Sequence, residues 1–327
     1  MVERRTLVAF VAAAVLFGGT FVAAKAGLAY FPPLLFVALR FDVAAVALAG
    51  FAVLTASRDE LLPRTRDDAV GILATGLLSV GLSNALLFVG QQHVTSAVAS
   101  IVFSLNPILT PVFAAVLLSD ERLSSRGGVG MALGLVGVAL VVGLDPANLL
   151  GGDAAHKAVL FAGAVAGALG SVLIRRADGT LSSTVRTAWG LPFGALLCHL
   201  LSISAGESVA AITWTPKALA ALAYVGLFAG AMAYIAYFGL LDATGAIRAN
   251  LVFYVVPVVT TLGGWALLGE TVSALAVVGF LTIFAGFAVI GSESVDFRTW
   301  LPDAVADRAD AEEGLLVGQE SVGYESD

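Results

Sequence analysis

The stretch NPILTPVFAAVLLSDERLSSRGGVGMALGLVGVALV at residues 106–141 recurs in altered form as VPVVTTLGGWALLGETVSALAVVGFLTIFAGFAVI at residues 256–290. At a shift of 150 or 149 residues, the copies share a proline, an acid and two glycines: Pro107/Pro257, Glu121/Glu270, Gly130/Gly279 and Gly137/Gly286. Apolar residues match easily by chance, but this ordered series of different residue types does not. The chain therefore contains an internal repeat.

The composition is that of a membrane protein. Hydrophobic residues make up 59% of the 327 residues and charged residues 13%, whereas globular domains average roughly 45–50% and about 25%. The mean hydropathy is +0.95. These values exclude a soluble enzyme, a disordered chain and a disulfide scaffold, and the single cysteine, Cys198, has no partner for an intrachain disulfide.

Ten apolar segments are long enough to be membrane spans, which need about 20 residues each. Unpaired backbone groups are very costly in lipid, so each span should be helical. The sequence therefore predicts an all-α integral membrane protein in the lipid bilayer, with ten transmembrane helices. The segments are about 6–28, 33–55, 69–90, 94–118, 127–144, 158–175, 183–203, 217–240, 244–268 and 272–291.

Basic residues in the predicted loops set the orientation, because cytoplasmic loops carry an excess of Lys and Arg. With the N-terminus inside, the outer loops hold only Lys157 and Lys217. The inner loops hold ten bases: Arg4, Arg5, Arg58, Arg64, Arg66, Arg122, Arg126, Arg175, Arg176 and Arg248. We therefore expect a multi-pass protein of the cell membrane with both termini in the cytoplasm.

The domain organisation follows from the repeat. Residues 6–144 and 158–291 each hold five predicted helices. Because five is odd, the second copy enters the membrane from the opposite side, as is usual in secondary transporters. Residues 292–327 hold ten acids and two bases, and we expect a disordered cytoplasmic tail. The rest of the chain is nearly neutral, so no nucleic-acid surface is expected.

Two stretches near the start complete the pattern: LFGGTFVAAKAGL at residues 16–28 and PPLLFVALRF at residues 32–41. With the two closing stretches, they resemble EamA-like domains of the drug/metabolite transporter superfamily. The resemblance covers residues 6–291. It implies a ten-helix carrier of two inverted five-helix domains, in a superfamily whose members move amino acids, metabolites, drugs and nucleotide sugars. The doublet Asp120-Glu121 departs from the second copy by one residue, which leaves open the counterpart of Glu270.

Two prolines occupy equivalent places in the predicted fourth and ninth helices. Pro107 and Pro257 lack an amide donor, so each frees a carbonyl four residues earlier. Paired helix breaks at corresponding positions indicate a central binding site in transporters with internal repeats. A packing kink is the alternative interpretation.

Three charged residues fall inside the first two predicted helices. Arg40 is a candidate substrate-binding or gate residue, or a structural anchor, because a charge within the membrane must face protein or water. Lys25 is a weaker substrate candidate, close enough to a helix end to extend to the interface. Asp42 is a candidate for proton coupling, since its carboxyl is neutral when protonated. Its alternative role is an ion pair with Lys25 or Arg40.

Polar and aromatic residues are spread over the predicted helices 3, 4, 8 and 9, which are equivalent pairs. As a set they predict a mixed polar and aromatic site for a small-molecule substrate. Any one of them has interhelical hydrogen bonding as its alternative role. The substrate-binding candidates are Asn84, Asn106, Tyr234, Asn250 and Tyr254, accompanied by Gln91, Ser104, Thr110, Tyr237 and Thr260.

The repeat and the resemblance favour a secondary active transporter that moves an amino acid or another small organic solute by alternating access. We expect an exporter that exchanges protons or a second solute, with no cofactor and no metal. The alternatives are an intramembrane enzyme, against which the absence of GxSxG, HExxH and GxxxxGK motifs argues, and a passive channel. Glycine pairs such as Gly130/Gly134 suit close helix contacts within one copy or in a homodimer.

Overall fold

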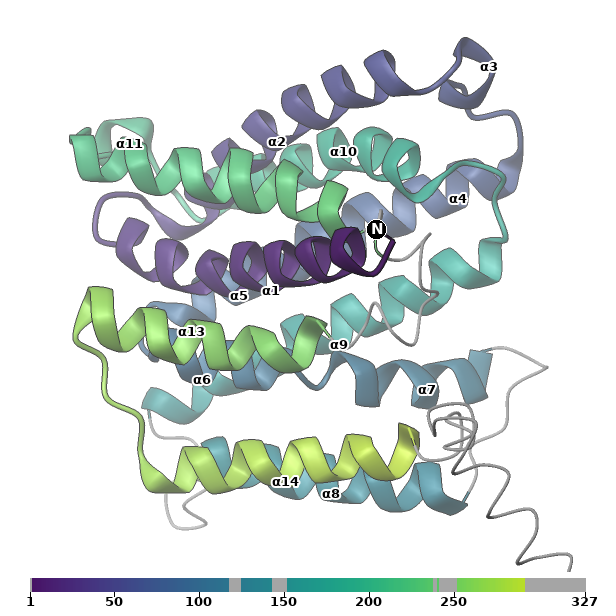
Figure 1. Ribbon diagram of the computed structural model, residues 1–327. Coiled ribbons are helices and arrows are strands. Elements are labelled where there is room, and N and C mark those ends of the chain that lie inside the picture. Colours follow the sequence, from purple (N-terminus) through teal and green to yellow (C-terminus); the bar gives the residue numbers. More distant parts are fainter. Residues whose placement is uncertain (1, 118–124, 143–151, 238–239, 241–251, 292–327) are drawn as a thin grey trace, which may run out of the picture.

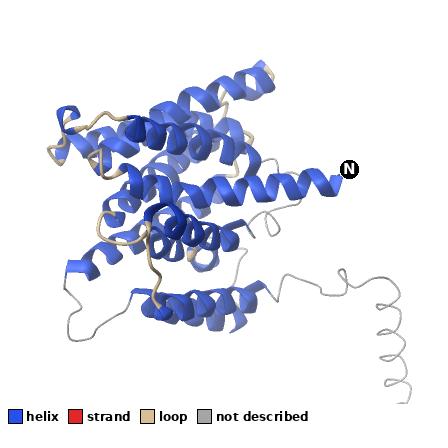
Figure 2. Ribbon diagram, turned by 60° about the vertical axis from the view of Figure 1, so that its left-hand side comes forward, coloured by secondary structure: helices blue, strands red, loops and turns tan. Residues whose placement is uncertain are grey.

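The computed structural model of this chain describes residues 2–117, 125–142, 152–237, 240 and 252–291 (Figure 1). Within these ranges the chain is helical and contains no strand (Figure 2), as the sequence predicts. The acidic segment 292–327 lies outside the described residues. The helices are α1 (Val2–Gly27), α2 (Pro33–Thr55), α3 (Arg58–Leu61), α4 (Arg66–Leu73), η1 (Ala74–Leu82), α5 (Ser83–Gln91), α6 (Ser96–Phe103), α7 (Asn106–Leu117), α8 (Ser125–Val142), α9 (Gly152–Ala177), α10 (Ser183–Ser204), η2 (Val209–Ala211), α11 (Pro216–Ala223), η3 (Tyr224–Met232), α13 (Val252–Leu268) and α14 (Ala274–Gly291).

Seven helical segments in the described part of the chain are long and apolar enough to cross a membrane. Three shorter apolar helices fall on the remaining predicted segments: Gly128–Gly137, Val255–Leu268 and Ala274–Gly286. By length and composition the chain is a multi-pass membrane protein. The seven segments are Thr6–Gly27, Pro33–Thr55, Arg66–Gln91, Ser96–Leu117, Ala155–Ala177, Ser183–Ser204 and Pro216–Tyr237.

Helices begin where the sequence supplies a cap. Pro33 is the first residue of α2, a position at which the missing amide donor costs nothing. Thr65 caps α4 by accepting the backbone N–H of Asp68 at 2.9 Å. Thr215 caps α11 by accepting the N–H of Ala218 at 3.1 Å. The two threonine caps lie 150 residues apart, so the same local signal starts a helix in each half.

The helix order of the first half recurs in the second. The starting residues of α1 and α9, α2 and α10, α4 and α11, and η1 and η3 are each 150 apart, and those of α8 and α14 are 149 apart. The contacts recur as well: α2 packs on η3 and α10 on η1, while α1 packs on α13 and α9 on α7. Two pairs, α2 with α10 and α8 with α14, pack on their own counterparts.

The segments η1 and η3 are π-helices of nine residues each. Such wide turns are rare and are usually found at functional sites. Each contains a glycine at a close helix contact. A Cβ on Gly226 would lie 2.8 Å from the Cβ of Val43 in α2, and one on Gly76 would overlap the carbonyl of Gly190 in α10. Both halves therefore place a π-helix directly against an α-helix.

Helices α8 and α14 form a layer of their own (Figure 1), joined by a seam that we call the glycine seam and define by Gly130, Gly137, Gly279 and Gly286. A Cβ on Gly137 would lie 2.6 Å from the carbonyl oxygen of Gly279. A Cβ on Gly286 would lie 2.5 Å from the carbonyl oxygen of Gly130. Only glycine lets the two backbones approach this closely.

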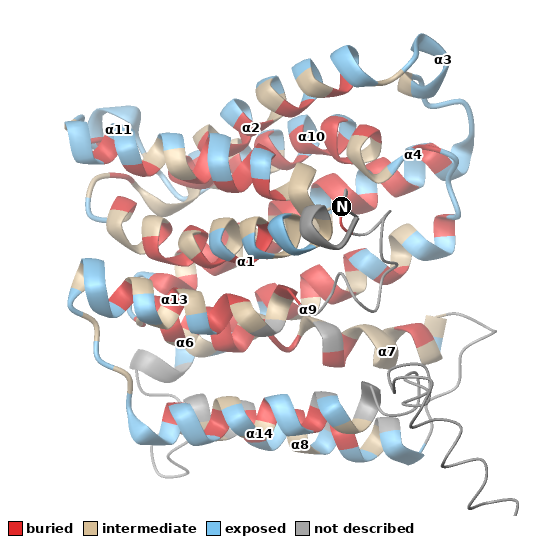
Figure 3. Ribbon diagram, in the orientation of Figure 1, coloured by how far each residue is buried: buried red, intermediate tan, exposed pale blue. Residues whose placement is uncertain are grey.

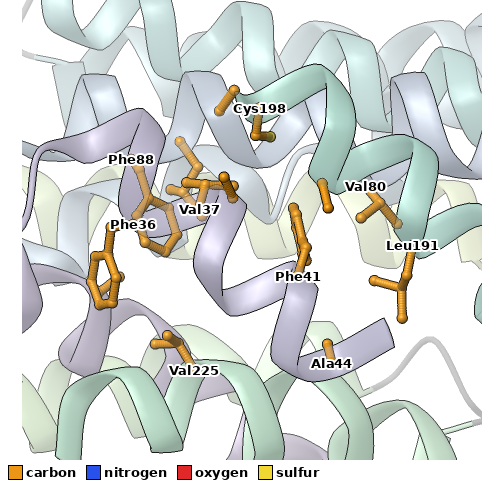
Figure 4. Packing of buried hydrophobic residues seen from close by; sticks show 14 of the residues in the cluster. Phe36, Val37, Phe41, Ala44, Val80, Phe88, Leu191, Cys198 and Val225 are labelled. Atoms are coloured by element: carbon orange, nitrogen blue, oxygen red, sulfur yellow. The ribbon is translucent and has the colours of Figure 1, made fainter. Parts of the chain in front are cut away.

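Burial follows the faces that helices turn toward one another (Figure 3). On α2, Phe36 and Phe41 are fully buried, whereas Val46 is 77% exposed. Figure 4 shows these two rings with Phe88 of α5 and Cys198 of α10 in one packed cluster. Large apolar side chains over the outer surface are unfavourable in water but suit lipid.

Candidate functional site

Arg40 is buried inside the helix bundle. Its side chain projects from α2, and the residue is 3% exposed. The guanidinium carbon lies 4.8 Å from the ring centre of Phe41 and 5.3 Å from that of Phe88. Among the described residues, its Nε and Nη1 have no hydrogen-bond partner. The neighbours that interact with it electrostatically are Tyr234 and Cys198. Aromatic rings thus surround a cation that lacks a carboxylate partner in the described part of the chain.

Asp42 turns to a different partner from those that the sequence suggests. Its Oδ2 lies 2.9 Å from Nε2 of His199 in α10. The two side chains are 47% and 36% exposed. The expected alternatives, an ion pair with Lys25 or with Arg40, do not form in the described part of the chain. Residues two apart on a helix point in different directions, which separates Asp42 from Arg40.

Four rings form a cluster that we call the aromatic cluster: Phe17, Tyr234, Tyr237 and Phe253. The ring centres of Phe17 and Tyr234 lie 5.4 Å apart, and those of Tyr237 and Phe253 lie 5.5 Å apart. Phe17 also stacks on Phe253 at 5.9 Å. These spacings are favourable for aromatic pairs. The predicted candidate Tyr234 is therefore part of an aromatic group drawn from α1, α13 and the helix that follows η3.

A second group, which we call the polar cluster, comprises Ser83, Asn106, Gly163 and Gly167, from α5, α7 and α9. Ser83 Oγ donates to the carbonyl of Gly163 at 2.8 Å. A Cβ on Gly167 would lie 3.0 Å from Ser83 Oγ and 3.3 Å from Asn106 Oδ1. Asn106 Oδ1 is buried and has no hydrogen-bond partner among the described residues. Asn84 does not join this group, because its Nδ2 donates to the carbonyl of Val80 in the preceding η1 at 2.8 Å.

The two clusters correspond at one position of the repeat, and each draws residues from both halves. At a shift of 150, Gly167 falls on Phe17 and Asn84 falls on Tyr234. Phe103 touches both halves: its ring centre lies 6.0 Å from that of Phe21, and its Cζ would lie 3.0 Å from a Cβ on Gly163. At these two positions of the repeat, a ring in one copy stands where the other copy has a small or polar residue.

The two candidate prolines differ in their effect on the backbone. The predicted fourth helix is broken, since α6 ends at Phe103 and α7 begins at Asn106, next to Pro107. The expected break at Pro257 is wrong within the described residues, because α13 continues through it from Val252 to Leu268. One turn beyond the proline, Thr260 Oγ1 donates to the carbonyl oxygens of Gly18 and Val256, which links α13 to α1.

Lys25 and Glu270 bind helix ends. Lys25 Nζ donates to the carbonyls of Gln91 and Gln92, at 2.9 and 3.0 Å. The carboxylate of Glu270 accepts the N–H of Ser96 at 3.0 Å and its hydroxyl at 2.5 Å. Together these contacts connect α1, α5, α6 and α13. Glu270 thus acts as a helix cap, as its position beside a predicted helix end suggests.

Two of the predicted substrate-binding residues lie wholly or partly outside the part of the chain that the structure describes. Asn250 lies outside the described residues, and for Tyr254 only the backbone, in α13, is described. Sequence reasoning missed His199 and Phe17. His199 lies within the seventh predicted span, where an ionisable residue is costly and marks a site. No group of three His, Cys, Asp or Glu side chains suited to a metal occurs in the described ranges.

Known proteins share the sequence pattern and the fold of this chain. The profile of the EamA-like transporter family matches residues 4–143 and 157–292. "Uncharacterized transporter YyaM" of Bacillus subtilis (strain 168) is 28% identical over 277 residues, which cover 82% of this chain and 88% of that protein. "Uncharacterized inner membrane transporter YedA" of Escherichia coli (strain K12) is 28% identical over 275 residues, covering 82% and 86%. A solved structure described as "Crystal structure of protein" shares the fold, with a TM-score of 0.58 at 23% identity over 88% of this chain and 96% of that chain.

Proposed function

Because the chain belongs to the EamA-like transporter family, we propose that it is a secondary active transporter that moves a small organic solute across the cell membrane by alternating access. Ten transmembrane helices, arranged as two inverted repeats of five, would carry this movement. The recurrence of helix starts and helix contacts between the halves supports this arrangement. Transporters of this kind rock one repeat against the other around a site near the middle of the membrane.

The observation that carries the proposal is the pairing of backbone irregularities with side-chain clusters. The π-helices η1 and η3 stand at equivalent positions. Each leads into a helix that contributes to one cluster: Ser83 follows η1, and Tyr234 follows η3. A solute held between the polar cluster and the aromatic cluster would be in contact with both halves, so rocking would change its access from one face to the other.

Counterflow in proteoliposomes tests the carrier mechanism. Vesicles loaded with unlabelled solute should accumulate labelled solute transiently, and the initial rate should saturate with concentration. The physical reason is that a carrier site must be occupied before it turns to the other side. Linear flux without counterflow would indicate a passive channel, and chemical conversion of the solute would indicate an enzyme. Protein-free vesicles are the control.

The pair formed by Asp42 and His199 is a candidate for proton coupling. Its two side chains are bonded to each other yet partly exposed, and among the described residues Cys198 interacts electrostatically with Asp42. Arg40 lies two residues away on α2. An acid in a membrane span can take up a proton on one side and release it on the other.

Replacing Asp42 with asparagine should therefore abolish accumulation driven by a pH gradient while leaving counterflow at equal pH in place. His199→Gln should weaken the same accumulation, because it removes the partner of the carboxylate. Solute accumulation would be measured with and without an imposed gradient. Gradient-driven accumulation that persists in Asp42→Asn would exclude this pair from coupling.

A further inference from the structure

We infer that the guanidinium of Arg40 binds the anionic group of the transported solute, and that this solute is an organic monoanion with an apolar body rather than a zwitterion. The inference rests on the proposed transport function, and it narrows the substrate class of the same site.

Arg40 has no basic counterpart in the second half of the chain. At a shift of 150 its counterpart is Gly190. The backbones of the two residues make equivalent contacts with a π-helix. The carbonyl of Gly190 lies against Gly76, and the carbonyl of Arg40 would lie 3.3 Å from a Cβ on Gly226. Glycine is therefore sufficient at this helix crossing. The crossing does not require the Arg40 side chain, so its charge in one half needs another explanation.

The described surroundings of the Arg40 guanidinium do not supply all the hydrogen-bond acceptors that it needs. Phe41 and Phe88 stabilise the cation through their ring faces, but a ring offers no lone pair to the N–H groups. Nε and Nη1 are buried without an acceptor in the described part of the protein. A buried charge is strongly unfavourable unless it is paired and hydrogen-bonded. A carboxylate of the solute would supply both the opposite charge and the acceptors, as Arg side chains commonly recognise such groups.

The same surroundings disfavour an ammonium group on the solute. Among the described residues, the electrostatic neighbours of Arg40 are Tyr234 and Cys198, neither of which carries a carboxylate. Asp42, the carboxylate nearest in sequence, is bonded to His199. A zwitterion would bring its positive group beside Arg40 without a carboxylate to receive it. Tyr234 in turn belongs to the aromatic cluster, so the apolar body of the solute would lie against Phe17 and Tyr237.

Matched ligands test this on the wild-type protein. Purified protein in detergent would be titrated with 3-phenylpropanoate, 3-phenylpropanamide and phenylalanine, and with the corresponding indole-3-propanoate and hexanoate series. Binding would be followed by thermal shift. A charge-assisted hydrogen bond predicts that each bound anion has a Kd about 10-fold or more below that of its neutral amide and of its zwitterion. Equal affinity within every series, or a preference for the amide or the amino acid, would overturn the inference without any variant.

Two substitutions then assign the effect to Arg40. Arg40→Gln should abolish the preference for the anion, whereas Arg186→Gln should keep it. Arg186 is a matched control, because its buried Nε likewise lacks a hydrogen-bond partner among the described residues, but it lies near the start of α10. If Arg40→Gln fails to fold, Arg40→Lys keeps the charge and should retain a weakened preference. An unchanged anion preference in a folded Arg40 variant would contradict the inference.

Counterflow with the same ligands distinguishes this inference from the proposed function. Saturable counterflow of a zwitterion or a neutral solute, without binding of the anions, would retain the carrier and reject the anion site. Anion binding that depends on Arg40, without counterflow of any solute, would retain the anion site and reject the carrier.

Discussion

Replacing Gly286 with leucine should separate α8 from α14 and strongly destabilise the protein. A Cβ at this position would lie 2.5 Å from the carbonyl oxygen of Gly130 and 2.9 Å from the backbone nitrogen of Gly134. Both atoms belong to a helix backbone, which cannot turn away as a flexible side chain can. Overpacking of a core typically costs about 1–3 kcal/mol, and we expect an effect of about 3 kcal/mol because backbone atoms must move. Thermal unfolding in detergent, followed by tryptophan fluorescence, measures it.

Gly128→Ala is the matched control in α8. A Cβ at Gly128 meets nothing within 4 Å. Alanine favours a helix over glycine by about 1 kcal/mol, so the control should unfold at the same temperature as the wild type or slightly higher. An unfolding temperature of Gly286→Leu equal to that of the wild type would show that the glycine seam is not a close contact.

The second large effect is expected at Asp68, which is 1% exposed. Its Oδ1 accepts the N–H groups of Thr180 and Leu181 at 2.6 and 3.2 Å, and its Oδ2 accepts those of Arg64 and Thr65 at 3.0 and 3.1 Å. One carboxylate thus joins the start of α4 to the turn between α9 and α10. In Asp68→Asn, an amide donor replaces one of the two acceptor oxygens, which leaves buried N–H groups without partners.

We therefore expect Asp68→Asn to lower the unfolding temperature and to expose the turn between α9 and α10 to proteases. The neighbouring Asp67 is exposed, so Asp67→Asn removes the same charge and should leave both properties unchanged. Limited proteolysis and thermal unfolding of the two variants form the comparison. Equal behaviour of the two would contradict a structural role for the Asp68 carboxylate.

Much of the fold could be predicted because its signals are local or repeated. The predicted span at residues 33–55 begins at Pro33, as α2 does. Gly130 and Gly279, which correspond at a shift of 149 residues, indicate matching helices in the two halves. The seven long apolar segments and the three shorter helices of the described chain fall on the predicted segments because hydropathy alone determines which residues lipid accepts. The apolar segments and the repeat thus follow from the residues themselves.

The rest depends on contacts between distant residues. Asp42 and His199 are 157 residues apart, and nothing beside Asp42 indicates this partner. The π-helix η1 contains ordinary apolar residues, and its wide turns accompany the packing of Gly76 on α10. At Pro257 the residue type indicates a break, but α13 continues through it from Val252 to Leu268. Such contacts cannot be predicted from the local sequence, because they depend on how distant segments pack.

The glycine seam also says something about how a chain of this kind could originate. Gly130 meets Gly286, and Gly279 meets Gly137, so exchanging the two copies reproduces the same contacts. This reciprocity is the property of an isologous interface between identical subunits. A single copy would thus already carry a surface that fits a second, antiparallel copy of itself, and gene fusion would add only the covalent link between two proteins that were partners beforehand.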